Sequence, residues 1–200
     1  MIAIIDYDAG NLKSVEKALN FLGEEAIITR DAEVLHKADK IILPGVGAFG
    51  VAMEKLHHYQ LVELIKDLAK EKPFLGICLG LQLMFEGSEE APGVKGLELL
   101  PGKIVRIPDC DGLKIPHIGW NDITTSESSK LFKGIQQNSY VYFVHSYYLS
   151  AKNEEDVAAT TFYSTTIHAA VEHDHVFGCQ FHPEKSGSVG LQILRNFAEL

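Results

Sequence analysis

Short apolar runs alternate with amphipathic segments along the first half of the chain, and this alternation limits the possible folds more than any other feature. Residues 2–6 have the pattern of a buried strand, and further strands are expected at 26–29, 40–43 and 74–77. Apolar residues at helical spacing lie at 12–22 and 56–68, and 79–85 begins a further helix. Because parallel strands need crossover connections, this order predicts an α/β fold whose central, mostly parallel sheet has helices on both faces.

The second half of the chain has a different pattern. Glycines and prolines interrupt residues 92–116, and four short β-rich runs follow at 140–144, 157–162, 166–171 and 176–181. Such runs predict a smaller antiparallel or mixed part built from hairpins. A last helix is expected over 189–199. Asn11 and Gly23 are expected to cap the first helix. Pro73 is expected to end the helix predicted over 56–68. With no repeat or linker, residues 1–200 are expected to form one domain.

Composition excludes several classes of function. The chain has 18 basic and 27 acidic residues, a net charge of −9, which argues against binding to nucleic acid or to an anionic membrane. Its first residues resemble a strand and not a signal peptide, and its longest near-apolar stretch is too short to span a bilayer. The three cysteines lack the spacing of a zinc site. A cytoplasmic protein without metal or cofactor is expected.

Cys78 is the first candidate for chemistry. It lies in Gly76-Ile77-Cys78-Leu79-Gly80, directly after an apolar strand. Small residues two positions before and after a nucleophile permit the sharp strand-to-helix turn that exposes its side chain, and the following helix start favours thiolate. The alternative is a buried structural cysteine, since free cysteine is among the most buried residue types.

His182 and Glu184 are candidates to activate that cysteine. They follow the apolar run that ends at Phe181 and are separated by Pro183. In an extended segment residues i and i+2 point the same way, so both side chains are expected to face one site. A carboxylate beside an imidazole fixes its tautomer and stabilises the imidazolium. The alternative is a solvated surface pair, the more common role of a histidine and a glutamate on a loop. Because the chain has eight other histidines, the choice of His182 depends on the motifs around it.

Pro44-Gly45-Val46-Gly47 follows the strand at 40–43. Its two glycines give a backbone whose N–H groups can turn towards an oxyanion, and the N–H of Leu79 would be the second donor. The alternative is an ordinary turn between strand and helix. Open α/β sheets place their sites at the carboxyl ends of strands. Three candidate segments at strand ends therefore predict a cysteine enzyme that attacks a carbonyl group.

The residues that carry these motifs resemble a known family. Gly76 to Gln82 together with His182-Pro183-Glu184 is similar to the class I (triad) glutamine amidotransferases, which have a flavodoxin-like fold. Four further segments, together with Lys185-Ser186, resemble the glutaminase subunits of imidazole glycerol phosphate synthase: residues 6–12, 44–49, 117–121 and 145–148. One departure is Asp8, where the family usually has glycine.

The resemblance implies roles for further residues. Cys78 would attack the side-chain amide of glutamine, and His182 would protonate the departing ammonia. The substrate would be held by Gln82 and by the backbone around Ser146 and Tyr147. Ammonia would pass to a (β/α)8-barrel cyclase subunit in a heterodimer of histidine biosynthesis. The predicted interface residues are Asn11, Trp120 and Lys185, although Trp120 fits a core position equally well.

Three other functions are compatible with some of these motifs. The glutaminase subunits of pyridoxal phosphate, anthranilate and aminodeoxychorismate synthesis share the cysteine turn and the His-x-Glu. They are not expected to combine Gly119-Trp120-Asn121 with Pro44 to Gly47. A γ-glutamyl hydrolase would act without a partner. A catalytically silent scaffold would not need Cys78, His182 and Glu184 intact.

Overall fold

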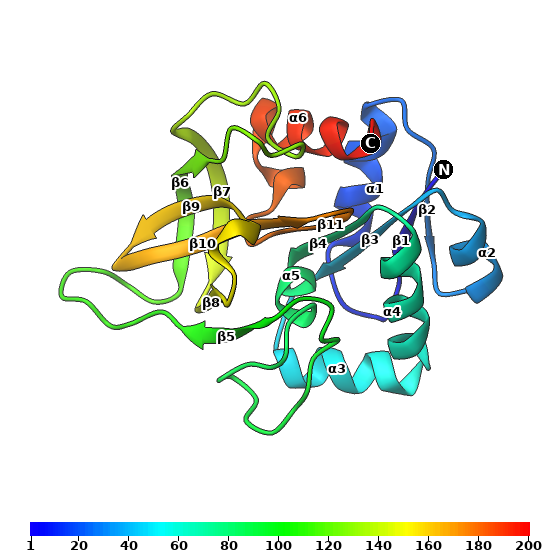
Figure 1. Cartoon of the computed structure of the whole chain (residues 1–200), viewed down its shortest axis with the longest axis horizontal. Coiled ribbons are helices and arrows are strands. Elements are labelled where there is room, and N and C mark those ends of the chain that lie inside the picture. Colours follow the sequence, from blue (N-terminus) through cyan, green and yellow to red (C-terminus); the bar gives the residue numbers. More distant parts are fainter.

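The computed structural model describes residues 1–200, and its eleven strands form one continuous sheet (Figure 1). Five strands form a parallel half in the order β2-β1-β3-β4-β11. They are β1 (Ile2–Ile5), β2 (Ala26–Thr29), β3 (Lys40–Gly45), β4 (Phe74–Cys78) and β11 (Val176–Cys179). Four of them, β1 to β4, were predicted as strands from the apolar runs of the first half. The parallel α/β arrangement is thus confirmed.

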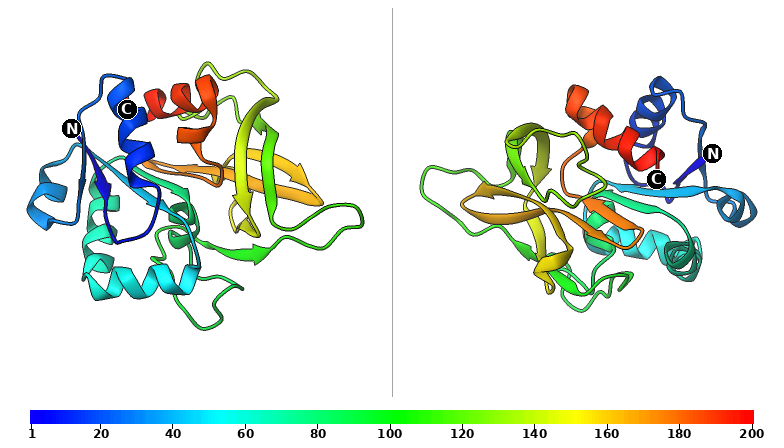
Figure 2. Two further views of the ribbon diagram at one scale, coloured as in Figure 1. Left: turned by 180° about the vertical axis from the view of Figure 1, so that it is seen from behind. Right: turned by 45° about the horizontal axis from the view of Figure 1, so that its top comes forward.

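Helices cover both faces of this parallel half (Figure 2). On one face lie α1 (Leu12–Phe21) and α6 (Gly187–Ala198); on the other lie α3 (Phe49–His58), α4 (Leu61–Glu71) and α5 (Leu79–Leu83), with α2 (Ala32–Lys37) near the β2 edge. The two faces bury hydrophobic cores of similar size, with 28 and 24 residues. Strands β1, β3, β4 and β11 are almost wholly buried between these layers, which explains their continuous apolar sequence, whereas the edge strand β2 is partly exposed.

The second half adds the antiparallel part. Beside β11 lie β10 (Thr165–His173), β9 (Val157–Tyr163), β6 (His117–Thr125) and β7 (Ser139–His145), in that order, while β8 (Tyr147–Ala151) joins β10 to β5 (Gly102–Arg106). The four predicted β-rich runs coincide with β7, β9, β10 and β11. Strands β5, β6 and β8 were not predicted, because their residues alternate between buried and exposed without a continuous apolar run.

Two local predictions are wrong. The helical pattern at 56–68 belongs to two helices, because Gln60 adopts a left-handed conformation (φ +56°) and turns the chain between α3 and α4. Leu56 and Leu61 are both buried, so the apolar spacing continues across the break. The side chain of Asn11 precedes α1 but accepts no backbone N–H; it accepts the Ser14 hydroxyl instead, at 2.8 Å.

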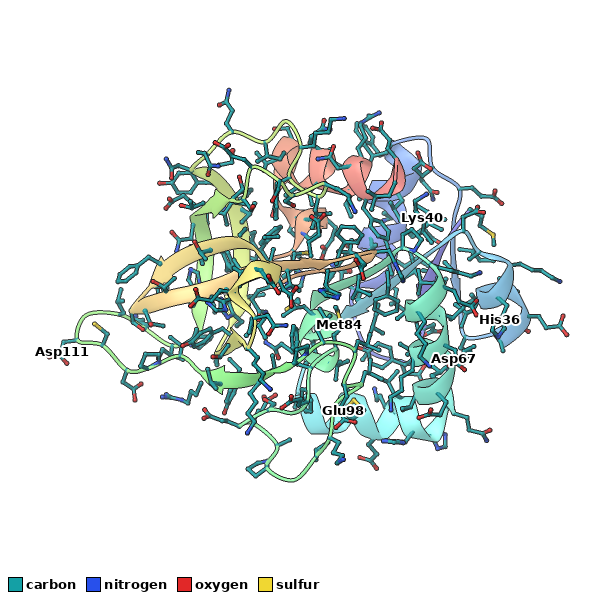
Figure 3. The ribbon with its side chains drawn as sticks, viewed as in Figure 1. His36, Lys40, Asp67, Met84, Glu98 and Asp111 are labelled. Carbon is teal, nitrogen blue, oxygen red and sulfur yellow. The ribbon has the colours of Figure 1, made fainter.

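The remaining connections are loops. The loop between β5 and β6 extends away from the body of the molecule with Asp111 near its tip, whereas Met84 lies in the interior beside α5 (Figure 3). No helix is both long and apolar enough to cross a membrane. The carboxyl ends of β3, β4 and β11 are neighbours in the sheet, and the candidate residues gather there.

Candidate active site

Cys78 ends β4 in a strained turn. Its backbone has φ +55° and ψ −110°, a combination that non-glycine residues rarely adopt. Strand β4 passes directly into α5 at this point, so the thiol stands at the junction of strand and helix. The predicted nucleophile turn is present in the structure. Strain of this kind typically costs about 1–3 kcal/mol and persists only where the surrounding packing enforces it.

The two glycines that flank Cys78 make this packing possible. A Cβ atom on Gly76 would overlap the Met84 sulfur and lie 2.8 Å from the Leu81 backbone. A Cβ atom on Gly80 would overlap the carbonyl oxygen of Leu43 in β3. Any side chain at either position would therefore push the turn away from the sheet.

His182 reaches the site from β11, the strand next to β4. Its Nδ1 lies 2.8 Å from Glu184 Oε1, and the two side chains are 2% and 1% exposed. The backbone N–H of His182 donates to Tyr142, and the Ser186 hydroxyl donates to the His182 carbonyl at 2.6 Å. Residues 183–185 form a 3-10 turn, so the extended geometry on which we based the pairing is wrong, although the predicted contact forms.

The electrostatics of His182 suit a base that acts on Cys78. Burial opposes the charged imidazolium, but the interactions of His182 with Cys78 and with the Glu184 carboxylate outweigh it and raise the pKa of His182 to about 9. The Nε2 atom is buried and has no hydrogen-bond partner. Because Nδ1 is occupied by Glu184, Nε2 is the ring nitrogen left for the sulfur and the substrate.

The predicted oxyanion segment lies on the other side of β4. Gly45 at the end of β3 pairs in register with Cys78, which places Val46 and Gly47 next to the thiol. Tyr7 anchors the start of this segment, because its buried hydroxyl donates to the Pro44 carbonyl at 2.9 Å. Burial and the nearby Cys78 sulfur raise the pKa of Tyr7, so this hydroxyl stays a donor. Leu79, the second predicted donor, begins α5.

A cavity of about 380 Å³ lies over Cys78 and has the size of a small-molecule site. It is lined by Val46, Gly47, Cys78, Leu79, Gln82, Glu90, Pro116, Val144, His145, Ser146, Tyr147, His182 and Lys185. Nine of the predicted site residues are among them. A larger surface hollow of about 690 Å³ over residues 125–137 and the end of α6 contains neither a cysteine nor a histidine. No cluster of His, Cys, Asp or Glu is arranged to bind a metal ion.

Gln82 and the backbone of Tyr147 are joined inside the protein. The Gln82 side-chain amide donates to the Tyr147 carbonyl at 3.0 Å and to the Gln180 Oε1 atom at 2.9 Å. Gln180 is fully buried, and its Nε2 lies 3.8 Å from the Cys78 sulfur. Sequence reasoning missed Gln180. Its only signal is a polar residue directly after the apolar strand β11, on the segment that leads to His182.

Glu90 is a second residue that sequence reasoning missed. It lies on the loop after α5, lines the cavity, and accepts the backbone N–H of Phe49 at 2.8 Å through one carboxylate oxygen. Because Glu90 belongs to no motif and its hydrogen-bond partner Phe49 comes from a distant part of the sequence, only the fold reveals its position.

Two of the predicted interface residues, Trp120 and Lys185, lie near the Tyr142 ring, and Lys185 also lines the cavity. Trp120 is 54% exposed, so the core position that the sequence also allowed is wrong. The Trp120 ring meets the Tyr142 ring edge-on at 6.1 Å, and the Lys185 ammonium lies 6.0 Å from the centre of the same ring. Asn11 is half-buried at the start of α1, one residue after Gly10, which packs near Gly45.

Comparison with known proteins shows which family this site belongs to. The family model for class I glutamine amidotransferases matches residues 3–200. The imidazole glycerol phosphate synthase subunit HisH of Methanothermobacter thermautotrophicus is 50% identical over 100% of this chain and 98% of its own. The HisH subunit of Methanocaldococcus jannaschii is 48% identical, with both chains fully covered. The chain belongs to the HisH family of class I glutamine amidotransferases. A solved glutamine amidotransferase has the same fold, with a TM-score of 0.77 at 19% identity over 100% of this chain and 98% of the other.

HisH-family membership confirms the resemblance predicted from the motifs and makes the chain an enzyme of the glutamine amidotransferase type. The flavodoxin-like fold class is confirmed as well. Asp8, where the family usually has glycine, adopts φ +60°, a conformation that glycine reaches without strain. Here Arg30 and Tyr59 donate to the Asp8 carboxylate and Lys55 donates to the Asp8 backbone carbonyl, and these bonds hold the residue in the loop after β1.

Proposed function

We propose that the chain hydrolyses glutamine to glutamate and ammonia with Cys78, His182 and Glu184. Through this reaction it would supply a cyclase subunit of imidazole glycerol phosphate synthase in histidine biosynthesis. The main support is the strained Cys78 turn, flanked in one sheet by a buried His182–Glu184 pair and by the Gly45–Gly47 segment. The HisH relatives, whose name describes a synthase subunit, support the same reading.

In the proposed reaction the Cys78 sulfur attacks the side-chain carbonyl carbon of glutamine. The negative charge that develops on the carbonyl oxygen is accepted by the N–H of Leu79 and by a backbone N–H of the segment Gly45-Val46-Gly47. His182 then gives its proton to the departing nitrogen, ammonia leaves, and a γ-glutamyl thioester remains. Water, deprotonated by His182, attacks this thioester and releases glutamate while the proton returns to the thiol. Glu184 holds the imidazole and stabilises its charged form.

Glutamine is a zwitterion, and the cavity offers matching groups. Glu90 places a carboxylate on the cavity wall, one oxygen of which holds Phe49. We assign the α-ammonium group of glutamine to this carboxylate. The polar wall formed by Gln82, Ser146 and Tyr147 would hold the rest of the amino acid. No cofactor takes part in the proposed steps.

The partner would cover the exposed aromatic face of β6 and β7. Ile118 and Trp120 on β6 and Tyr140 on β7 are each more than half exposed and lie on the same face of the hairpin, near Lys185. Large apolar side chains exposed together are typical of interaction surfaces. We propose that a (β/α)8-barrel cyclase docks here and next to Asn11, forming a heterodimer in the cytoplasm.

Replacing Cys78 with alanine tests this function. In the complex with the cyclase subunit, Cys78→Ala is expected to abolish synthesis from glutamine and to retain synthesis from added ammonia. Loss of both activities, or retention of both, would contradict the proposal. A silent scaffold predicts that Cys78→Ala changes nothing. A γ-glutamyl hydrolase predicts full activity without the partner, and a different class I subunit predicts that the cyclase does not co-purify.

A further inference from the structure

Two buried histidines outside the triad face each other at one end of the β6–β7 hairpin. His117 and His145 are paired in register, and His117 Nδ1 lies 3.0 Å from His145 Nε2. His145 Nδ1 lies 3.0 Å from the carbonyl oxygen of Tyr147. Both residues are less than a tenth exposed, and His145 lines the cavity over Cys78.

These contacts determine which ring nitrogens carry protons. A carbonyl oxygen only accepts, so His145 Nδ1 must be the donor to Tyr147. In a neutral imidazole the other nitrogen is then an acceptor, and His145 Nε2 must receive a proton from His117 Nδ1. His117 Nε2 becomes an acceptor in turn, and the Asn121 amide nitrogen lies 3.5 Å from it. This series of hydrogen bonds therefore runs in a single direction, from Asn121 to the Tyr147 carbonyl.

The surroundings of the pair keep it neutral. The His117 ring is stacked between Phe143 and Tyr163, with centroid distances of 4.8 and 4.0 Å. Burial lowers the pKa of His117 to about 4 and that of His145 to about 3, and the nearby His117 and His182 rings lower the latter further. Two neutral rings maintain this order of donors and acceptors. A protonated ring has an N–H on both nitrogens, so the hydrogen bond that one of its nitrogens now accepts would have to reverse.

The Tyr147 carbonyl connects this series of hydrogen bonds to the proposed substrate site. It accepts both from His145 and from the Gln82 side chain, which continues to Gln180 and the Cys78 sulfur. We propose that His145 and His117 are positioning residues that fix the Tyr147 carbonyl and, through it, the Gln82 amide in the orientation that binds glutamine. This inference rests on the proposed glutaminase function. Neither ring contacts the triad by hydrogen bond, so the effect is expected on substrate binding more than on turnover.

The kinetic test measures glutamate release by the complex with the cyclase subunit. His145→Leu removes one hydrogen-bond donor from the Tyr147 carbonyl. KM for glutamine is expected to rise about 2- to 13-fold, which corresponds to the loss of one neutral hydrogen bond. The value of kcat is expected to stay within about twofold of the wild type. His145→Asn places an N–H where Nδ1 stood and is expected to recover most of the loss. The control is His175→Leu, which also breaks a histidine–carbonyl bond (Nε2 to Ala69 at 2.9 Å) but lies at the opposite end of β11, and its KM is expected to equal that of the wild type.

A second measurement does not depend on activity or on a variant that folds. Long-range proton–nitrogen NMR of the full chain is expected to show His117 and His145 both in the Nδ1–H form at neutral pH. An Nε2–H form at either residue, or equal KM values for His145→Leu and His175→Leu, would overturn the inference. If the wild-type complex releases no glutamate, the proposed function fails. The tautomers of His117 and His145 measured by NMR would then still show whether the hydrogen bonds run in the direction assigned here.

Discussion

Mild acid is expected to destabilise the protein through the buried pair His117 and His145. An unfolded histidine has a pKa near 6.5, whereas burial lowers the pKa of these two residues to about 4 and about 3. Below pH 6.5 the unfolded chain therefore takes up protons that the folded chain does not. The stability that depends on their neutrality is fully present above pH 6.5 and is lost as the pH falls towards the folded-state values.

The size of the loss follows from the shifts. Each histidine costs about 1.4 kcal/mol per pH unit, so between pH 6.5 and 5 each removes about 2 kcal/mol, or about 4 kcal/mol for the pair. This is a large part of the 5–15 kcal/mol that typically stabilises a domain of this kind. His182 does not offset it. Its pKa is raised to about 9, so below pH 6.5 it is protonated in both states and its contribution is constant.

The variant that tests this calculation is His117→Phe. Phenylalanine keeps a ring stacked between Phe143 and Tyr163 but cannot titrate. Urea unfolding followed by circular dichroism at several pH values between about 7 and 5 would give the free energy of unfolding for both proteins. The wild-type value is expected to fall more steeply than that of the variant, and below about pH 6 the difference between the slopes approaches about 1.4 kcal/mol per pH unit. Burial also lowers the pKa of His168, so the difference between the slopes, not the wild-type slope, is the relevant measure.

Parallel curves for the two proteins over this range would refute the reasoning. They would mean that His117 binds its proton equally well in the folded and unfolded states, and so that the ring is not held neutral by its surroundings. A lower stability of the variant at pH 7 alone would not affect the conclusion, because the slope and not the intercept reports the proton.

Three further predictions concern the site. Glu184→Gln keeps the shape of the side chain but removes the charge that helps to raise the pKa of His182, so kcat for glutamate release is expected to fall about 10²- to 10⁴-fold with folding intact by circular dichroism. Gly80→Ala would force a methyl group into the Leu43 carbonyl, and we expect a loss of glutaminase activity and a lower melting temperature; unchanged activity would show that the turn is not held by this contact. Glu90→Gln is expected to raise KM for glutamine by about tenfold or more with a smaller change in kcat, since a charged hydrogen bond is worth about 1.5–3 kcal/mol; an unchanged KM would place the α-ammonium group elsewhere.

Local sequence was enough to predict the parts of the protein that depend on neighbouring residues. The apolar runs and helical spacing of the first half gave the parallel strands, and Gly76 to Gly80 gave the turn at Cys78 because its geometry depends on residues within two positions. The motif around His182 gave the pairing with Glu184 even though the backbone there is a 3-10 turn and not an extended segment.

The rest depended on which distant segments became neighbours. The pairing of β6 with β7 brings His117 to His145, the position of β11 beside β4 brings Gln180 to Cys78, and the loop after α5 brings Glu90 to the cavity. None of these contacts leaves a local pattern. A hydrogen bond between residues far apart in sequence is set by strand order and register, and both are decided by the packing of the whole chain. The sequence alone therefore predicted Cys78 as the candidate nucleophile and indicated the family, and only the tertiary structure decided what surrounds this cysteine.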